Sequence, residues 1–202
     1  MQRILLLLMT LSTLPMLAQD GLEFSLSGGP GRSYLIMNDD TSKTAANLQL
    51  SVQVGFLLND KVELFTGVQY WQSGFATSLT DQGGNLVATA DYVTYGLPVG
   101  VRYYLTNNLY GAIRLVPAIQ AFAGDDNTSD PVFAFEFTEG SMRSFHLFGE
   151  VNLGYAIHLS DAFDIDLEPR LGHSFTPVLD AEGINGRLFE YGINIRLQYR
   201  IW

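Results

Sequence analysis

"YGLPVGVRYYLTNNLYGAIRLVP", residues 95–117, reads as two β-strands joined by a three-residue turn. One face of the first strand is apolar and consists of Leu97, Val99, Val101 and Tyr103. The opposite face carries small, rigid or charged residues, namely Gly96, Pro98, Gly100 and Arg102. Because successive side chains of a strand point to opposite sides, this stretch predicts a wall with one apolar side and one side where glycine lies near arginine.

The same alternation with period two continues along the chain, and no segment shows a convincing helical period. It predicts eight strands, near residues 22–27, 47–56, 62–71, 92–105, 109–122, 145–158, 163–171 and 189–201. Tight turns are expected at 59–61, 106–108 and 160–161, which are rich in Asn, Asp, Ser and Thr. Longer polar loops are expected near 36–46, 76–90, 124–143 and 176–186. Short connections that alternate with long ones predict an all-β, eight-stranded antiparallel up-and-down barrel.

The N-terminal segment MQRILLLLMTLSTLPMLAQD has the layout of a secretory signal peptide, with Arg3 before an apolar run. We expect cleavage after Ala18, so that residues 1–18 are the signal peptide and 19–202 form one barrel domain. The chain has no cysteine and a formal net charge of −10. We therefore expect no disulfides and no nucleic-acid partner.

Two kinds of barrel fit this alternation: a soluble barrel with its apolar face inside, and a membrane barrel with its apolar face toward lipid. The polar face favours the membrane barrel, because its glycines leave room for long charged side chains in a narrow lumen. Charges of both signs can pair there. Glu190 is one of the charged residues on this face. We expect a structural network of luminal salt bridges made by Glu63, Arg102, Arg114, Glu150, Asp164, Asp166, Glu168, Arg170, Arg196 and Arg200.

Aromatic residues gather toward the predicted strand ends, where membrane barrels carry aromatic girdles. The expected girdle residues are Tyr70, Phe75, Tyr92, Tyr103, Tyr110, Phe122, Phe145, Phe163, Phe175, Phe189 and Tyr199. Their distribution favours a lipid-facing exterior.

The sequence resembles the small outer-membrane β-barrel proteins of Gram-negative bacteria, particularly the PorT-like outer membrane protein beta-barrel domain group and the OmpA-, OmpX- and OmpW-like barrels. The stretch that carries the resemblance is residues 95–119, where an apolar-Pro-apolar strand ends in Tyr-Tyr, turns, and returns through a Gly-containing strand. The resemblance implies a transmembrane β-barrel of the cell outer membrane. It also implies outer-membrane lipids, lipopolysaccharide and the barrel-assembly machinery as partners.

Two segments invite a chemical reading. His173 and Ser174 could suggest a hydrolase, but adjacent strand residues point to opposite faces and cannot form a catalytic dyad. The acidic segment 125–136 spaces its oxygen-bearing side chains like a calcium loop, although no helices flank it. The calcium candidates are Asp125, Asn127, Ser129 and Glu136. A solvated acidic loop is the competing interpretation.

The sequence therefore predicts a non-enzymatic outer-membrane barrel without a cofactor, structural or surface-binding through long acidic extracellular loops. Aromatic residues among the acids of loop 124–143 suit an extracellular ligand or protein; they are Phe133, Phe135 and Phe137. The alternative is a narrow, porin-like OmpW-type channel for small or apolar solutes. Apolar residues on the polar face favour this alternative, namely Phe65, Trp71, Val116 and Phe148.

Overall fold

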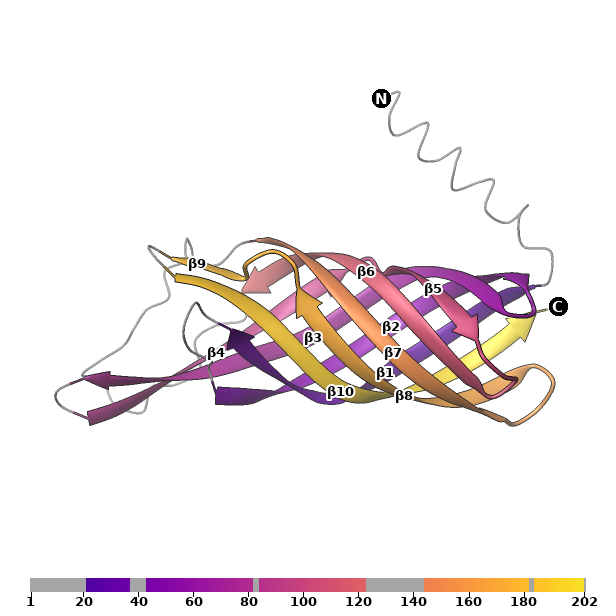
Figure 1. Ribbon diagram of the computed structural model, residues 1–202, viewed down its shortest axis with the longest axis horizontal. Coiled ribbons are helices and arrows are strands. Elements are labelled where there is room, and N and C mark those ends of the chain that lie inside the picture. Colours follow the sequence, from indigo (N-terminus) through magenta and orange to yellow (C-terminus); the bar gives the residue numbers. More distant parts are fainter. Residues whose placement is uncertain (1–20, 37–42, 82–83, 123–143, 182–183, 202) are drawn as a thin grey trace, which may run out of the picture.

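The computed structural model describes residues 21–36, 43–81, 84–122, 144–181 and 184–201. These residues are built into antiparallel β-strands (Figure 1). The strands are β1 Leu22–Ile36, β2 Lys43–Asn59, β3 Val62–Asp81, β4 Gly84–Gly96, β5 Val99–Tyr104, β6 Leu109–Phe122, β7 Phe145–His158, β8 Phe163–Ser174, β9 Leu179–Ala181 and β10 Ile184–Ile201. Within the described ranges, no helix is long and apolar enough to cross a membrane.

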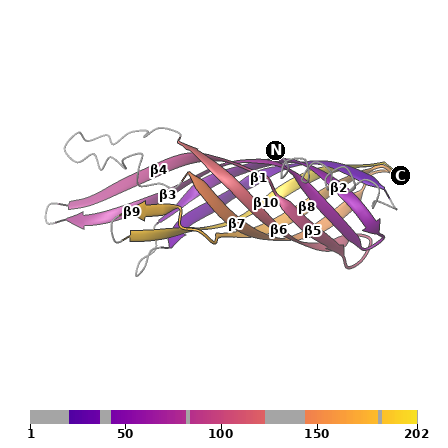
Figure 2. The same ribbon diagram turned by 90° about the horizontal axis from the view of Figure 1, so that it is seen from above.

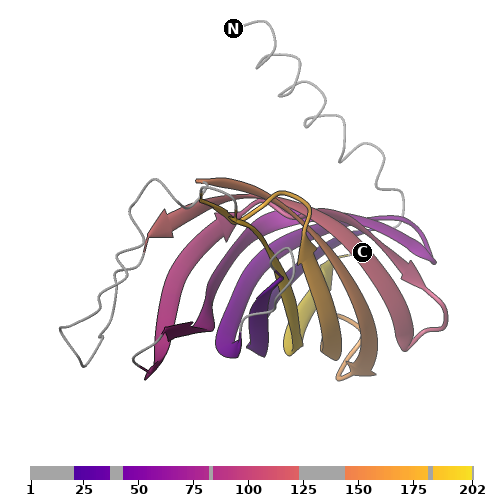
Figure 3. The ribbon, with the colours of Figure 1, turned by 60° about the vertical axis from the view of Figure 1, so that its left-hand side comes forward.

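The strands form a closed wall. They pair in the order β1-β2-β3-β4-β6-β7-β8-β10, and β5 follows β4 end to end between β3 and β6. β1 also pairs with β10, from Leu22 opposite Ile201 to Ile36 opposite Arg187, so the sheet closes on itself. Counting β4 and β5 as one position in the wall, the predicted eight-stranded antiparallel up-and-down barrel is confirmed, with β9 as a short addition on β10. Figure 3 shows the tilted strands side by side.

Pro98 explains why one wall position is divided between β4 and β5. Proline has no N–H to give to a strand ladder, and β4 ends just before it while β5 begins just after it. The N–H of Leu97 still donates to the carbonyl of Pro117 at 3.0 Å. The wall is therefore continuous across the interruption.

The three expected tight turns lie between β2 and β3, β5 and β6, and β7 and β8. Each is closed by the side chain at its start. Asn59 Oδ1 accepts from the N–H of Val62 at 2.9 Å, Thr106 Oγ1 from that of Leu109 at 3.0 Å, and Ser160 Oγ from that of Phe163 at 3.1 Å. This is the local side-chain-to-backbone bonding that suits these residue types to turns.

Three expected loop boundaries are wrong. In place of a loop at 76–90, β3 and β4 continue as a paired ribbon to Asp81 opposite Gly84, which extends past the other strands (Figure 2). The sequence at its tip contains a Gly-Gly pair, a favoured hairpin turn, and Thr, Val and Leu precede and follow it. Likewise β2 begins at Lys43 inside the expected loop 36–46, and β9 pairs with β10 inside the expected loop 176–186.

The two faces of the wall differ as the alternation predicts, with polar side chains inside and apolar ones outside. On β6, Ile113 is 67% exposed whereas Arg114 is 3% exposed. On β7, Val151 is 55% exposed whereas Glu150 is 5% exposed. This arrangement is the reverse of a soluble barrel.

The expected girdle needs one correction. Tyr110 is fully buried in the barrel interior rather than at the outer surface, because it shares the inward parity of Ala112 and Arg114. Phe145, Phe163 and other expected girdle residues are exposed, and the rings of Phe163 and Tyr199 lie 4.7 Å apart. The side chains of Phe75, Tyr92 and Phe122 lie outside the described residues.

A glycine makes room for Tyr110, which generates the first prediction. A Cβ on Gly154 would overlap the Tyr110 ring, and this ring cannot turn aside because the guanidiniums of Arg102 and Arg196 each lie 5.1 Å from its centre. We expect Gly154→Ala to lower the free energy of unfolding by about 1–3 kcal/mol, as overpacking does, in urea titrations of the barrel in lipid vesicles. Gly111→Ala is the matched control, because the nearest atom is 4.0 Å from its Cβ. Equal effects of the two substitutions would contradict the prediction.

Candidate functional site

The barrel interior is the candidate site, and its charged side chains form two clusters. We call the group nearer the short turns the turn-side cluster; it consists of Glu23, Glu63, Arg102, Asp164, Asp166, Glu168, Arg196 and Arg200. The group nearer the long connections is the loop-side cluster; it consists of Arg114, Glu150, Arg170 and Glu190. All ten residues of the expected network lie in these clusters, and each forms a salt bridge within its own cluster.

Arg196 on β10 is the centre of the turn-side cluster. Its Nε lies 2.7 Å from Asp166 Oδ2 and 3.5 Å from Glu168 Oε1. Its remaining nitrogens donate to Glu23 at 3.1 Å and to Gln198 at 2.6 Å. The side chain is fully buried, so these partners replace the water that a guanidinium would otherwise bind.

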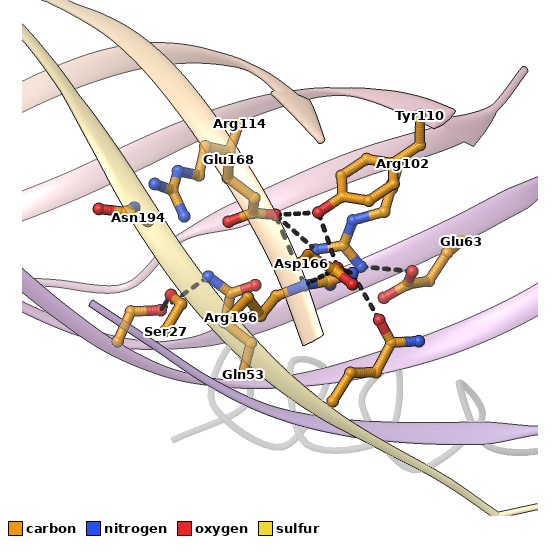
Figure 4. Close-up of polar contacts among 12 residues, drawn as sticks. Ser27, Gln53, Glu63, Arg102, Tyr110, Arg114, Asp166, Glu168, Asn194 and Arg196 are labelled. Atoms are coloured by element: carbon orange, nitrogen blue, oxygen red, sulfur yellow. Dashed lines mark hydrogen bonds and ion pairs between the residues drawn. The ribbon is translucent and has the colours of Figure 1, made fainter. Parts of the chain in front are cut away.

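Arg102 on β5 approaches the same carboxylates from the opposite wall (Figure 4). It pairs with Glu63 and lies 3.3 Å from Glu23 Oε1 and 4.0 Å from Glu168 Oε1. Tyr110 lies between the two arginines, and its hydroxyl is 2.5 Å from Glu168 and 2.9 Å from Asp166. The ring contributes cation–π contacts to both guanidiniums.

Glu23 connects the first strand of the barrel to the last. Besides Arg102 on β5, it accepts from Arg196 and Gln198 on β10 and lies 3.7 Å from Arg200. Arg200 also lies 3.6 Å from Asp164, which in turn pairs with His158 at 2.6 Å. The seam between β1 and β10 is thus joined inside the lumen as well as along the backbone ladder.

The loop-side cluster contains the most regular ion pair. Arg114 donates to Glu150 through Nε at 2.9 Å and through a terminal nitrogen at 2.6 Å. The amide of Gln49 donates to the same carboxylate at 3.2 Å and 3.3 Å. Next to this pair, Arg170 lies 3.5 Å from Glu190, which accepts from Ser73 at 2.5 Å.

Apolar side chains fill the lumen on either side of the charges. Toward the long connections, Trp71, Val116 and Phe148 are buried together, with the Trp71 and Phe148 rings edge to face at 5.3 Å. Toward the short turns, Leu57 packs with Tyr104 and Tyr110, whose rings lie 5.5 Å apart. In the described part of the chain, the interior is therefore a packed core.

Catalytic and metal-binding arrangements are not among the described residues. His173 and Ser174 lie on opposite faces, as expected: Ser174 is buried and accepts from the N–H of Leu188 at 2.7 Å, while the His173 ring lies 6.4 Å from that of Phe189 outside. No group of three His, Cys, Asp or Glu residues that could hold a metal occurs among the residues described. The calcium candidates and the aromatic loop candidates, in 125–137, lie outside the described residues.

Several interior residues were not anticipated as members of the network. Glu23 has the inward parity of its strand, so the alternation could have identified it. Tyr104 and Tyr110 also have the inward parity of their strands, although an aromatic residue at a strand end is typical of the outer girdle. The amides of Gln49, Gln198 and Asn194 also belong to the network, and only a knowledge of which strands face each other across the lumen would identify their partners.

No protein-family model and no curated protein matches the chain. The specific resemblance to the PorT-like group is therefore not supported. Among solved structures, the chain is similar to the Neisserial surface protein A, at 15% identity over 86% of this chain and 95% of that one, with a TM-score of 0.47. It is similar to Ail of Yersinia pestis, solved with the heparin analogue sucrose octasulfate, at 13% identity over 89% and 99%, with a TM-score of 0.44. It is also similar to the outer membrane protein OprG of Pseudomonas aeruginosa, at 13% identity over 91% and 98%, with a TM-score of 0.44. No ligand or activity is carried over from these structures.

The pair of Arg114 and Glu150 generates the second prediction. Arg114→Met leaves a buried carboxylate with amide partners only, so we expect the free energy of unfolding to fall by about 3–5 kcal/mol. Arg114→Met combined with Glu150→Met removes both charges, and we expect it to recover most of that loss. Urea titrations of the three proteins measure the difference.

Arg200→Met is the matched control for this cycle. Its side chain is 18% exposed and its carboxylate partners are at least 3.6 Å away, so the expected loss is about 1 kcal/mol or less. A double variant as unstable as Arg114→Met alone would show that the pair is not the source of the effect.

Proposed function

We propose that this chain is an integral protein of the bacterial outer membrane, non-enzymatic, and either structural or surface-binding through its long connections. The observation that carries the proposal is the reversed sidedness of the barrel. Soluble proteins rarely expose contiguous apolar patches larger than a few hundred Å², whereas apolar side chains cover the outside of this barrel from strand to strand. Such a surface is suited to contact with the acyl chains of a lipid bilayer.

The height of the apolar surface supports a membrane location. On β10 the outward residues run from Tyr191 to Ile201 without a charge, and on β1 from Leu22 to Pro30. A tilted strand needs about 9–11 residues to cross a bilayer, which both stretches provide. By the general rule for such barrels, the short turns face the periplasm and the long connections face outward.

The filled lumen supports a structural or binding role over transport. Arginines and carboxylates from opposite walls meet in the middle of the barrel, and apolar clusters lie on either side of them. Surface binding then depends on the long connections, whose sequences are rich in Asp and Glu and include Phe133, Phe135 and Phe137.

Fractionation of cells that express the full chain tests the membrane location. We expect the protein in the outer-membrane fraction, with a band that migrates differently on an SDS gel with and without boiling, because a closed barrel resists the detergent until heated. Ile113→Arg places a charge in the middle of the apolar surface and should abolish the unboiled band, since such a charge costs about 2–4 kcal/mol there. Asn107→Arg, at an exposed position of a short turn, is the matched control and should leave the unboiled band. A soluble band that boiling does not shift would mean a soluble barrel.

Planar-bilayer recordings test the alternative of a narrow channel. The wild-type barrel should give no steady conductance, because paired side chains occupy the lumen. Single-channel steps, or uptake of apolar solutes into vesicles that contain the barrel, would favour the channel. The apolar cluster of Trp71, Val116 and Phe148 would then line its outer mouth.

A further inference from the structure

Two arginines break the apolar exterior, and they lie on neighbouring strands. Arg32 on β1 and Arg187 on β10 are exposed on the outward face. Among the described side chains, every carboxylate lies inside the barrel or in a short turn, so none shares the outward face of the strands with them. Within the described part of the chain, these two cations therefore have no carboxylate on their own face, and a bound anion would balance their charge.

The level of these arginines on the wall is defined by the pairing of β1 with β10. Arg32 lies opposite Tyr191, where the apolar stretches of both strands end on the side of the long connections. Arg187 lies opposite Ile36, closer still to the long connections. Between them the rings of Tyr34 and Phe189 lie 5.2 Å apart. Cations with aromatic rings at the end of an apolar surface are suited to the level of lipid headgroups.

An apolar hollow lies next to Arg32 on the same outer wall. It is a broad, open hollow of about 1090 Å³ that runs across the wall from β1 and β10 over β8 and β7 to β6 and β5, and its lining includes Arg32, Tyr191, Ile193, Leu153, Ile113 and Gly111. Gly111 contributes to the depth of the hollow, because a Cβ there would meet nothing closer than 4.0 Å. The hollow therefore extends from the charged level into the apolar part of the wall.

We infer that this corner of the barrel binds one phosphorylated lipid of the outer leaflet, the lipid A part of lipopolysaccharide. Its phosphates lie against Arg32 and Arg187, and its acyl chains lie along the hollow. Guanidinium groups match the geometry and charge of phosphate, and the apolar lining matches an acyl chain. The inference rests on the proposed membrane location with the long connections outward.

Binding of purified diphosphoryl lipid A to the mature barrel in neutral detergent tests the inference, with native mass spectrometry as the readout. Wild type should bind diphosphoryl lipid A, and its affinity for chemically dephosphorylated lipid A should be lower by a factor of about ten or more. Arg32→Gln combined with Arg187→Gln should lose the preference for phosphate, while Arg32→Lys combined with Arg187→Lys should keep most of it. Arg32→Gln alone should lose part of the preference, and Lys61→Gln, which removes one exposed positive charge from a short turn, is the matched control for it.

Gly111→Leu tests the hollow separately, because it fills the space without touching the arginines. It should weaken binding of both lipid A forms and leave the ratio between them unchanged. The unboiled gel band shows whether each variant is folded. If the arginine variants do not fold, weaker binding by folded Gly111→Leu still tests whether the lipid occupies the hollow. Equal binding of the two lipids by wild type, or unchanged binding by folded variants, would overturn the inference and leave the membrane location standing. A wild-type chain absent from the membrane fraction would instead overturn the proposed function.

Discussion

The narrow interior of an eight-stranded barrel is the constraint on which the rest of this structure depends. It has room for side chains and little else, so each charged group that points inward needs a partner that also points inward. Arg196 shows the result: it is fully buried, and Asp166, Glu168 and Glu23 surround it. The glycines on the same face follow from the same lack of space, as at Gly154, where the ring of Tyr110 occupies the place of a side chain.

Much of the fold could be predicted from the sequence, because one periodicity encodes both the strands and their orientation. A side chain whose neighbours along the strand face lipid must itself face the interior, so the inward position of Arg102 or Asp166 follows without knowledge of any contact. The tight turns were also predictable, since Asn59, Thr106 and Ser160 close them through purely local hydrogen bonds.

The rest could not be predicted because it depends on contacts across the lumen or on residues without a clear preference. Gln49 and Glu150 are 101 residues apart, and nothing local to either one points to the other. The residue type of Tyr110 suits the outer girdle, although its parity on β6 places it in the interior. The extension of β3 and β4 to Asp81 and Gly84 does not follow from the alternation, because small and polar residues are interspersed among Leu79, Leu86 and Val87.

Glu23 has a consequence for the order in which the chain acquires its structure. It is among the first residues of β1, and three of its partners, Arg196, Gln198 and Arg200, are among the last of β10. In an intermediate with every hairpin formed but the seam open, Arg196 would keep its partners Asp166 and Glu168 on β8, whereas Glu23 would lose its partners on β10. A carboxylate without its cations inside the barrel carries a high free-energy cost. We therefore expect partly closed barrels to be poorly populated, so that closure waits for the last strand to arrive.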